Sequence, residues 1–460
     1  MIAFALLLPL CASAAPAEDS AAFCGGSYTG NASVPSATQP QTLADLVAIG
    51  MKNNTDTRTS WLQAEDAALG LGITRSKFGP ILAAEAAALH EHAAFPLPKT
   101  LEPRGYFKTD AEAVVPAVTL KWLVYDAGGK EAALEQASQS LSAARFGFSA
   151  THRKVTILIT RQFFHLSAML ARRDAAQSAL DNAGKVQQVA QARQGRGLGS
   201  APETLQARAA LAEAQLQLEE AGAAVEDARM AVLEATGLRP DTALCMAVPT
   251  TAPAPEAERS VDQLVASAIA SRPEMQAALA QVKAGEAGVD LAKSEYGPKV
   301  LLQAHAGQNI GRTRANGGDW ATVNQPMYGI GLVFQLPLYD GVIRANNVAI
   351  ARSKQETAEA KLDGVRNQVV HEVIKAHLDL QLARRRGESS AALLVSAQEA
   401  FDATLKSYRQ GLSTMQELTS STAALARART AHSQAIADQH TARAVLAFAA
   451  GDMVDVLPQP

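Results

Sequence analysis

The chain repeats one structural pattern twice. Three short motifs return in the same order in its second half: Phe78-Gly79-Pro80 as Tyr296-Gly297-Pro298, Tyr125-Asp126 as Tyr339-Asp340, and Gly197-Leu198 as Gly411-Leu412. The spacing between partners is nearly constant, and its small change falls in a loop region, where length varies easily. Ordered matches over so long a distance indicate a duplicated unit.

Both copies predict the same series of elements. Each begins with an amphipathic helix, followed by two strands, a very long helix, a glycine-containing turn and a return helix. In the first repeat (43–237) we expect them at 43–77, 80–92, 113–124, 128–194 and 201–237. In the second repeat (260–450) we expect them at 260–295, 299–308, 327–338, 341–409 and 415–450. A linker at 238–259 joins the repeats, and a tail at 451–460 follows them.

The strand predictions depend on an alternation of side chains with period two. From Tyr328 to Leu336 the even positions are apolar, whereas the intervening residues are mostly glycine or polar. One apolar face fits a strand with lipid or core on one side and water on the other. The alternation at 113–124 is weaker, and Pro116 interrupts it because proline cannot donate to a strand ladder.

Long helices and few strands together predict the fold. A helix over 128–194 would measure roughly 100 Å at about 1.5 Å per residue, so it must lie against other helices. Four strands cannot close a barrel, whereas three copies supply about twelve, enough to leave a lumen. We therefore predict an α+β membrane protein. Its trimeric 12-stranded β-barrel, with four strands per protomer, continues as a long α-helical barrel of two pseudo-repeated hairpins.

Composition and motifs exclude several other classes. Lys and Arg number 42 against 45 Asp and Glu, and the net charge of −3 gives no basic footprint for nucleic acid. Beyond the extreme N-terminus, no apolar run is long enough for a transmembrane helix, which excludes a helical transporter. The pairs His90/His92 and His371/His377 lack zinc-site spacing, and no P-loop or nucleophile elbow occurs. We expect no enzyme activity, metal or cofactor.

The N-terminus predicts export. Ile2 to Leu10 are apolar, and the small residues after them fit a cleavage site, so we interpret 1–14 as a signal peptide and 15–42 as an N-terminal tail. Cleavage would remove Cys11 and leave Cys24 and Cys245, joined in one disulfide or present as two free thiols. A lipid anchor on Cys11 is a third alternative, disfavoured by the bulky residue before it.

Together, the duplicated motifs resemble the TolC family of outer-membrane efflux proteins from about Leu43 to Gly451. The resemblance implies a homotrimer in outer-membrane lipid, with a helical barrel across the periplasm and an equatorial belt. It also implies an exit duct of a tripartite export system, whose partners are a periplasmic adaptor protein and an inner-membrane pump. A disulfide between Cys24 and Cys245, which lies in the proline-rich link, would tie the N-terminal tail to the belt.

The two hairpin turns carry the residues of most functional interest. In the family, such turns form the tips that meet the adaptor, which implies docking roles for Gly197, Leu198, Gly411 and Leu412. The alternative for the leucines is a hydrophobic contact within the helix end itself. Ser200 and Thr414 are placed to cap the return helices.

Three further residues are candidates for the pore entrance. The family carries an acidic residue at the position of Glu417 and a tyrosine at that of Tyr408, and Glu203 is the counterpart of Glu417 in the first repeat. Three symmetry-related carboxylates would favour cations at a constriction. Each glutamate can instead complete a capping box, Glu203 with Ser200 and Glu417 with Thr414. We weigh the capping role equally with the pore role for Glu417 and prefer it for Glu203.

We therefore predict a passive channel that exports small molecules. The outer-membrane component of a type I protein secretion system is an alternative, because the pump selects the substrate. A periplasmic adaptor has one hairpin between split β halves, and a coiled-coil structural protein would lack the alternating strands. These two classes fit the duplicated pattern less well.

Overall fold

The computed structural model describes the chain except for residues 1–19, 26–39, 250, 254–258 and 453–460. It contains two compact units, each described on its own. The sheet unit comprises 63–145 and 277–363. The hairpin unit comprises the described residues up to 62, 146–276 and those from 364 onward.

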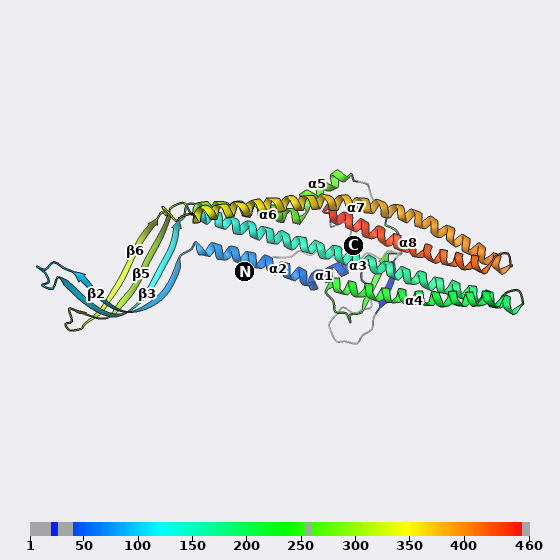
Figure 1. The fold of residues 1–460 in the computed structure, drawn as a ribbon, viewed down its shortest axis with the longest axis horizontal. Coiled ribbons are helices and arrows are strands. Elements are labelled where there is room, and N and C mark those ends of the chain that lie inside the picture. Colours follow the sequence, from blue (N-terminus) through cyan, green and yellow to red (C-terminus); the bar gives the residue numbers. More distant parts are fainter. Residues whose placement is uncertain (1–19, 26–39, 250, 254–258, 453–460) are drawn as a thin grey trace, which may run out of the picture. The chain divides into compact units, whose positions relative to one another are not determined.

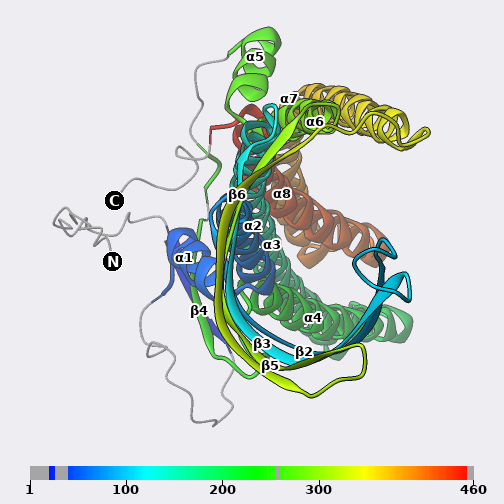
Figure 2. The same ribbon diagram turned by 90° about the vertical axis from the view of Figure 1, so that its left-hand side faces the viewer.

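The sheet unit holds four antiparallel strands, seen in Figure 1 and as a curved sheet in Figure 2. They are β2 (Ile81–Pro96), β3 (Tyr106–Tyr125), β5 (Lys299–Ala315) and β6 (Ala321–Gln335), in the order β2-β3-β5-β6. All four strands extend further into the polar loops than the sequence predicts, because the residues there continue the cross-strand pairing. The last strand, β6, also stops earlier than predicted.

Pro116 is accommodated inside β3. It lies opposite Ala86 of β2, whereas the pairing of β3 with β5 is interrupted between Val114 and Ala117. Because proline has no N–H to donate, this interruption removes the need for a hydrogen bond at that point. The strand therefore continues through a residue that weakens the sequence prediction.

Two long helical hairpins supply most of the hairpin unit. The first is α3 (Gly129–Gly195) with α4 (Ala201–Thr236), and the second is α7 (Ile343–Arg409) with α8 (Met415–Ala450). The part of α3 up to residue 145 and the part of α7 up to residue 363 belong to the sheet unit. In Figure 1 each long helix turns back at its tip into its return helix. The unit also contains a short two-stranded sheet of β1 (Ser20–Gly25) and β4 (Leu244–Pro249).

The predicted single helices over 43–77 and 260–295 are each divided in two. The first consists of α1 (Leu43–Asn53) and α2 (Thr55–Lys77), and the second of α5 (Val261–Ser271) and α6 (Pro273–Ser294). Pro273 explains the second break, because the residue before a proline is pushed towards extended backbone, as seen for Arg272. At the first break the side-chain Oδ1 of Asn54 accepts from the Asp56 N–H at 2.8 Å and caps the start of a new helix.

Two apolar clusters stabilise the hairpin unit. One joins α1, α3, α4 and β4 around Leu46, Ile159 and Val232. The other joins the tip-proximal parts of both hairpins around Phe401, Leu418 and Leu425. Many of the remaining buried positions are alanines, which let helices approach closely. Among the described residues, no helix is long and apolar enough to cross a membrane.

Candidate functional site

The two hairpin tips are built by the same turn. Gly197 and Gly411 have φ of 72° and 78°, the left-handed region that ends a helix. The N–H of Leu198 then bonds to the Arg193 carbonyl, and that of Leu412 to the Ser407 carbonyl, both at 2.9 Å. These are the backbone bonds that define the Schellman motif, so the two Gly-Leu pairs of the sequence form the same turn.

Both tip leucines are exposed in the single chain. The exposed fraction is 67% for Leu198 and 78% for Leu412. The hydrophobic contact that often accompanies a Schellman turn would bury them, so the structure does not support that alternative. Each tip of the single chain therefore presents one apolar side chain to solvent.

The capping boxes differ between the two return helices. The Thr414 hydroxyl accepts from the Glu417 N–H at 3.2 Å, and the Glu417 carboxylate accepts from the Thr414 N–H at 2.9 Å. Ser200 accepts from the Glu203 N–H at 3.5 Å, but the reciprocal bond is absent from the bonds recorded for α4. The preference for a capping role at Glu203 is wrong for its carboxylate, because that carboxylate has another partner.

Glu203 connects the first hairpin to the second. Its Oε2 accepts a hydrogen bond of 3.0 Å from the hydroxyl of Tyr408, which lies near the C-terminal end of α7. Tyr408 is 1% exposed. Burial, followed by the bond to Glu203, raises the pKa of Tyr408 to about 12, so its hydroxyl keeps its proton at neutral pH.

Arg193 is a further member of this site that the sequence prediction missed. Its guanidinium donates to the Tyr408 carbonyl oxygen at 2.6 Å and to the Leu198 carbonyl oxygen at 3.0 Å. Its Cζ also lies 4.8 Å from the centre of the Tyr408 ring. Its counterpart in the second repeat is Ser407, so the duplication did not point to Arg193. The sequence signal that could have indicated it is a basic residue in the last turn of a helix, where such side chains bond to the final carbonyl groups.

We call Arg193, Glu203 and Tyr408 the tip bridge. Its members come from α3, α4 and α7, so it joins both hairpins. Glu417 is not part of it: the Ser413 hydroxyl and then the Thr414 N–H bond its exposed carboxylate and lower its pKa. The structure thus brings two of the three predicted entrance residues together and leaves the third at its own helix end.

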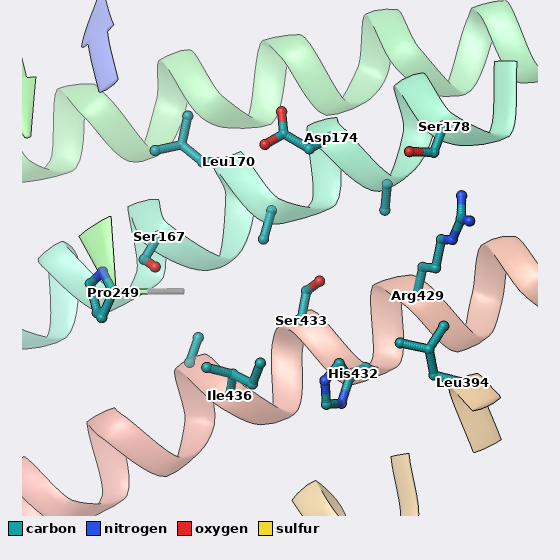
Figure 3. Close-up of a pocket in the computed structure, with 13 residues that line it drawn as sticks. Ser167, Leu170, Asp174, Ser178, Pro249, Leu394, Arg429, His432, Ser433 and Ile436 are labelled. Carbon is teal, nitrogen blue, oxygen red and sulfur yellow. The ribbon is translucent and has the colours of Figure 1, made fainter. Parts of the chain in front are cut away.

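The hairpins separate further along their length. A groove of about 360 Å³ lies between α3 and α8, with Pro249 of β4 at one end (Figure 3). Ser167, Asp174 and Ser178 line it from α3, and Arg429 and Ser433 from α8. Because this interface is not packed along its whole length, the tip bridge is a local connection between the hairpins.

Cys245 lies in β4 and is disulfide-bonded. In the antiparallel pairing of β1 with β4, the backbone position opposite Cys245 is Cys24. The N-terminal segment is also held near Gln41, whose N–H and carbonyl bond to Cys245 and Ala247 at 2.8 and 3.0 Å. The predicted signal peptide (1–14) with Cys11, and the C-terminal tail beyond Asp452, lie outside the described residues.

Comparison with known proteins gives consistent matches. Residues 51–238 and 264–452 both match the model of the outer membrane efflux protein family. Protein CyaE of Bordetella pertussis is 26% identical over 412 residues, covering 89% of this chain and 84% of that protein.

Solved structures of similar fold include two outer membrane proteins. The CmeC outer membrane channel of Campylobacter jejuni has a TM-score of 0.73 at 17% identity, covering 89% of this chain and 86% of its own. The outer membrane protein VceC of Vibrio cholerae has a TM-score of 0.72 at 18% identity, covering 89% and 96%.

Proposed function

The chain belongs to the outer membrane efflux protein family, and we propose that three copies of it form the passive exit duct of a tripartite export system. Family and fold place it in the outer membrane as a channel rather than an enzyme. The family match and the fold do not agree with the two other protein classes considered, a periplasmic adaptor and a structural coiled coil. Which molecule is exported depends on the pump, so we assign small molecules only as a class.

The four-stranded sheet carries this proposal. Its edge strands β2 and β6 each pair on one side only within the chain. An unpaired backbone edge cannot stand in lipid, so the sheet must be completed by further copies. Three copies give about twelve strands, enough for a barrel with a lumen.

The two faces of the sheet support its orientation in that barrel. Even-numbered positions form a continuous apolar band: Leu82, Val114, Val118, Leu120, Val300, Leu302, Tyr328, Ile330, Leu332 and Phe334. Odd-numbered positions are smaller and more polar, among them Thr119, Lys121, Gln303, His305 and Gly329. We assign the even face to lipid and the odd face to the lumen. The β2–β3 and β5–β6 loops then face outward, because the opposite strand ends continue into helices.

The tips support docking to a periplasmic adaptor. Leu198 and Leu412 are large, apolar and exposed at equivalent places in both hairpins. An adaptor can bury them without disturbing the helix ends, because the turns are already closed by their own backbone bonds. The inner-membrane pump would then contact the duct through that adaptor.

The tip bridge supports a gate at the periplasmic entrance. It holds α7 against the first hairpin through contacts that must break if the hairpins separate. Glu417 lies at the adjacent helix start with an exposed carboxylate, and three copies near the axis would attract cations. Opening then requires an energy source, for which adaptor binding is our candidate.

Two measurements on the full-length protein test this function. Outer-membrane fractions run unboiled on mild-detergent gels should show a trimer that dissociates on boiling, and that trimer should form ion-conducting channels in planar bilayers. Leu198→Ser with Leu412→Ser should abolish crosslinking to the adaptor while leaving trimer and channel intact. A monomer in the soluble periplasmic fraction would refute the duct.

A further inference from the structure

A charged cluster interrupts the apolar face of the sheet near its loop end. We call it the arginine ladder: His90 and His92 of β2, Asp110 and Glu112 of β3, and Arg312 and Arg314 of β5. Strand register places His90, Glu112 and Arg312 in one rung, and His92, Asp110 and Arg314 in the next. All six positions are even-numbered, so they share the face that carries the apolar band.

Both rungs are connected by ion pairs. Arg312 bonds to Glu112 through Nε and Nη2 at 2.7 and 2.6 Å, and Arg314 bonds to Asp110 through Nε at 2.7 Å. His90 lies 3.4 Å from Glu112, and His92 contacts Asp110. The carboxylates occupy the central strand, so each is held between an arginine and a histidine.

Trp320 packs against both arginines of the ladder. The Cζ atoms of Arg312 and Arg314 lie 4.6 and 4.8 Å from its ring centre. A guanidinium stacked on an aromatic ring loses less freedom when it binds a ligand, which favours recognition of an anion. Each arginine has five N–H donors. Two nitrogen atoms of Arg312 and one of Arg314 bond to the partner carboxylate.

In each rung the arginine is more exposed than its carboxylate partner. The side chains of Arg312 and Glu112 are 55% and 36% exposed, and those of Arg314 and Asp110 are 38% and 16% exposed. An approaching headgroup therefore meets guanidinium and imidazole groups that are more exposed than the carboxylates they contact. The ladder is formed within three adjacent strands of one chain, and completing a barrel at the β2 and β6 edges leaves this face open.

The ladder's height fits a lipid headgroup. Even positions from Val300 to Ile310 in β5 are apolar except for Gln308, which pairs with Asn324. That stretch measures roughly 33 Å along the strand, or about 25 Å across a bilayer when the strand is tilted, the usual height of an apolar band. Arg312 and Arg314 are the next even positions, so they lie where headgroups replace acyl chains.

We propose that the arginine ladder binds phosphate-bearing lipid headgroups of the outer leaflet. Planar guanidinium groups bind phosphate oxygens bidentately, and an apolar band directly beneath them accommodates the acyl chains of the same lipid. This site rests on the proposed function, because it needs the loops to face outward and the even face to face lipid. It would attach each protomer to its membrane independently of any exported substrate.

The test uses full-length trimers in detergent and a defined probe. Trimers are incubated with diphosphorylated lipid A or with the same lipid lacking both phosphates, and retained lipid is counted by native mass spectrometry. Wild type should prefer the phosphorylated lipid about tenfold, the usual effect of one charge-assisted contact. Arg312→Gln with Arg314→Gln should abolish that preference. Lys121→Gln with Lys299→Gln, which removes two charges from the opposite face, should leave it unchanged.

Several outcomes would overturn the proposal. Equal retention by wild type and the Arg312/Arg314 glutamine variant would show that the ladder does not bind the headgroup. Complete displacement of lipid A by inorganic phosphate alone would indicate a site for the free ion. If the glutamine variant does not assemble, Arg312→Lys with Arg314→Lys decides, because losing the planar fork should reduce the preference several-fold. Trimer formation and conductance of the wild type test the proposed function separately.

Discussion

Tyr408→Phe isolates the gating contribution of one hydrogen bond. The substitution removes the hydroxyl that donates to Glu203 at 3.0 Å and retains the buried ring beneath Arg193. A hydrogen bond to a charged group contributes about 1.5–3 kcal/mol, and Glu203 is only half-buried, so water can replace part of it. We therefore expect a loss of about 1–1.5 kcal/mol per protomer.

That loss should be visible in channel gating. If the bridges of three protomers open together, about 3–4.5 kcal/mol is removed from the bridged state, and the ratio of open to closed channels rises by roughly 150- to 2,000-fold. Single-channel recording in planar bilayers measures this ratio directly. The control is Tyr328→Phe, which removes a hydroxyl from the exposed face of the sheet. Unchanged open probability in Tyr408→Phe, with normal trimer yield, would refute the tip bridge as a gate.

Three further predictions follow from other parts of the structure. Glu417→Gln should reduce cation selectivity in single-channel recordings, and unchanged selectivity in this variant would exclude a carboxylate ring. The bonds from Ser413 and Thr414 lower the pKa of Glu417, so the selectivity of the wild type should persist down to pH values below about 4.5, the ordinary pKa of the group. Non-reducing peptide mapping should recover Cys24 joined to Cys245, and Cys245→Ser should free the N-terminal segment to proteolysis, whereas recovery of two alkylated thiols would contradict the pairing. Burial lowers the pKa of His440, whose Nε2 lies 2.8 Å from the Thr251 carbonyl oxygen. The contribution of His440 to folding stability should therefore be fully present above pH 6.5 and decrease as the pH falls below that value. His440→Gln should weaken this acid dependence of the melting temperature, and an identical pH profile in the variant would assign the dependence to other groups.

The sequence predicted those features that depend on local rules. Glycine turns, helix caps and alternating strands each need only neighbouring residues, and the duplication provided two independent examples of each. The family and the channel class are confirmed by the match over both repeats. The strand ends could not be placed correctly, because Asp110 and Arg314 look like loop residues until their cross-strand partners are known.

Contacts between distant segments account for what the sequence did not predict. Arg193 and Tyr408 are more than two hundred positions apart, and only the fold shows that a side chain at the end of α3 reaches a carbonyl oxygen at the end of α7. Thr204 shows a similar limit: its hydroxyl donates to Gln194 at 2.6 Å, whereas its counterpart in the second repeat is the buried Leu418. Equivalent positions in the repeats therefore keep their backbone geometry but not their partners.

The two glutamates show how a duplicated sequence can produce an asymmetric site. Glu203 and Glu417 have the same spacing from their turns, and both could complete a capping box. Only Glu203 lies within reach of a tyrosine from the other hairpin, and its carboxylate bonds to Tyr408. Glu417 has no such neighbour among the bonds described, so it caps α8 and keeps an exposed carboxylate. In the proposed duct, Glu203 would hold the hairpins together while Glu417 would face the permeating solution, which a symmetric pair could not do.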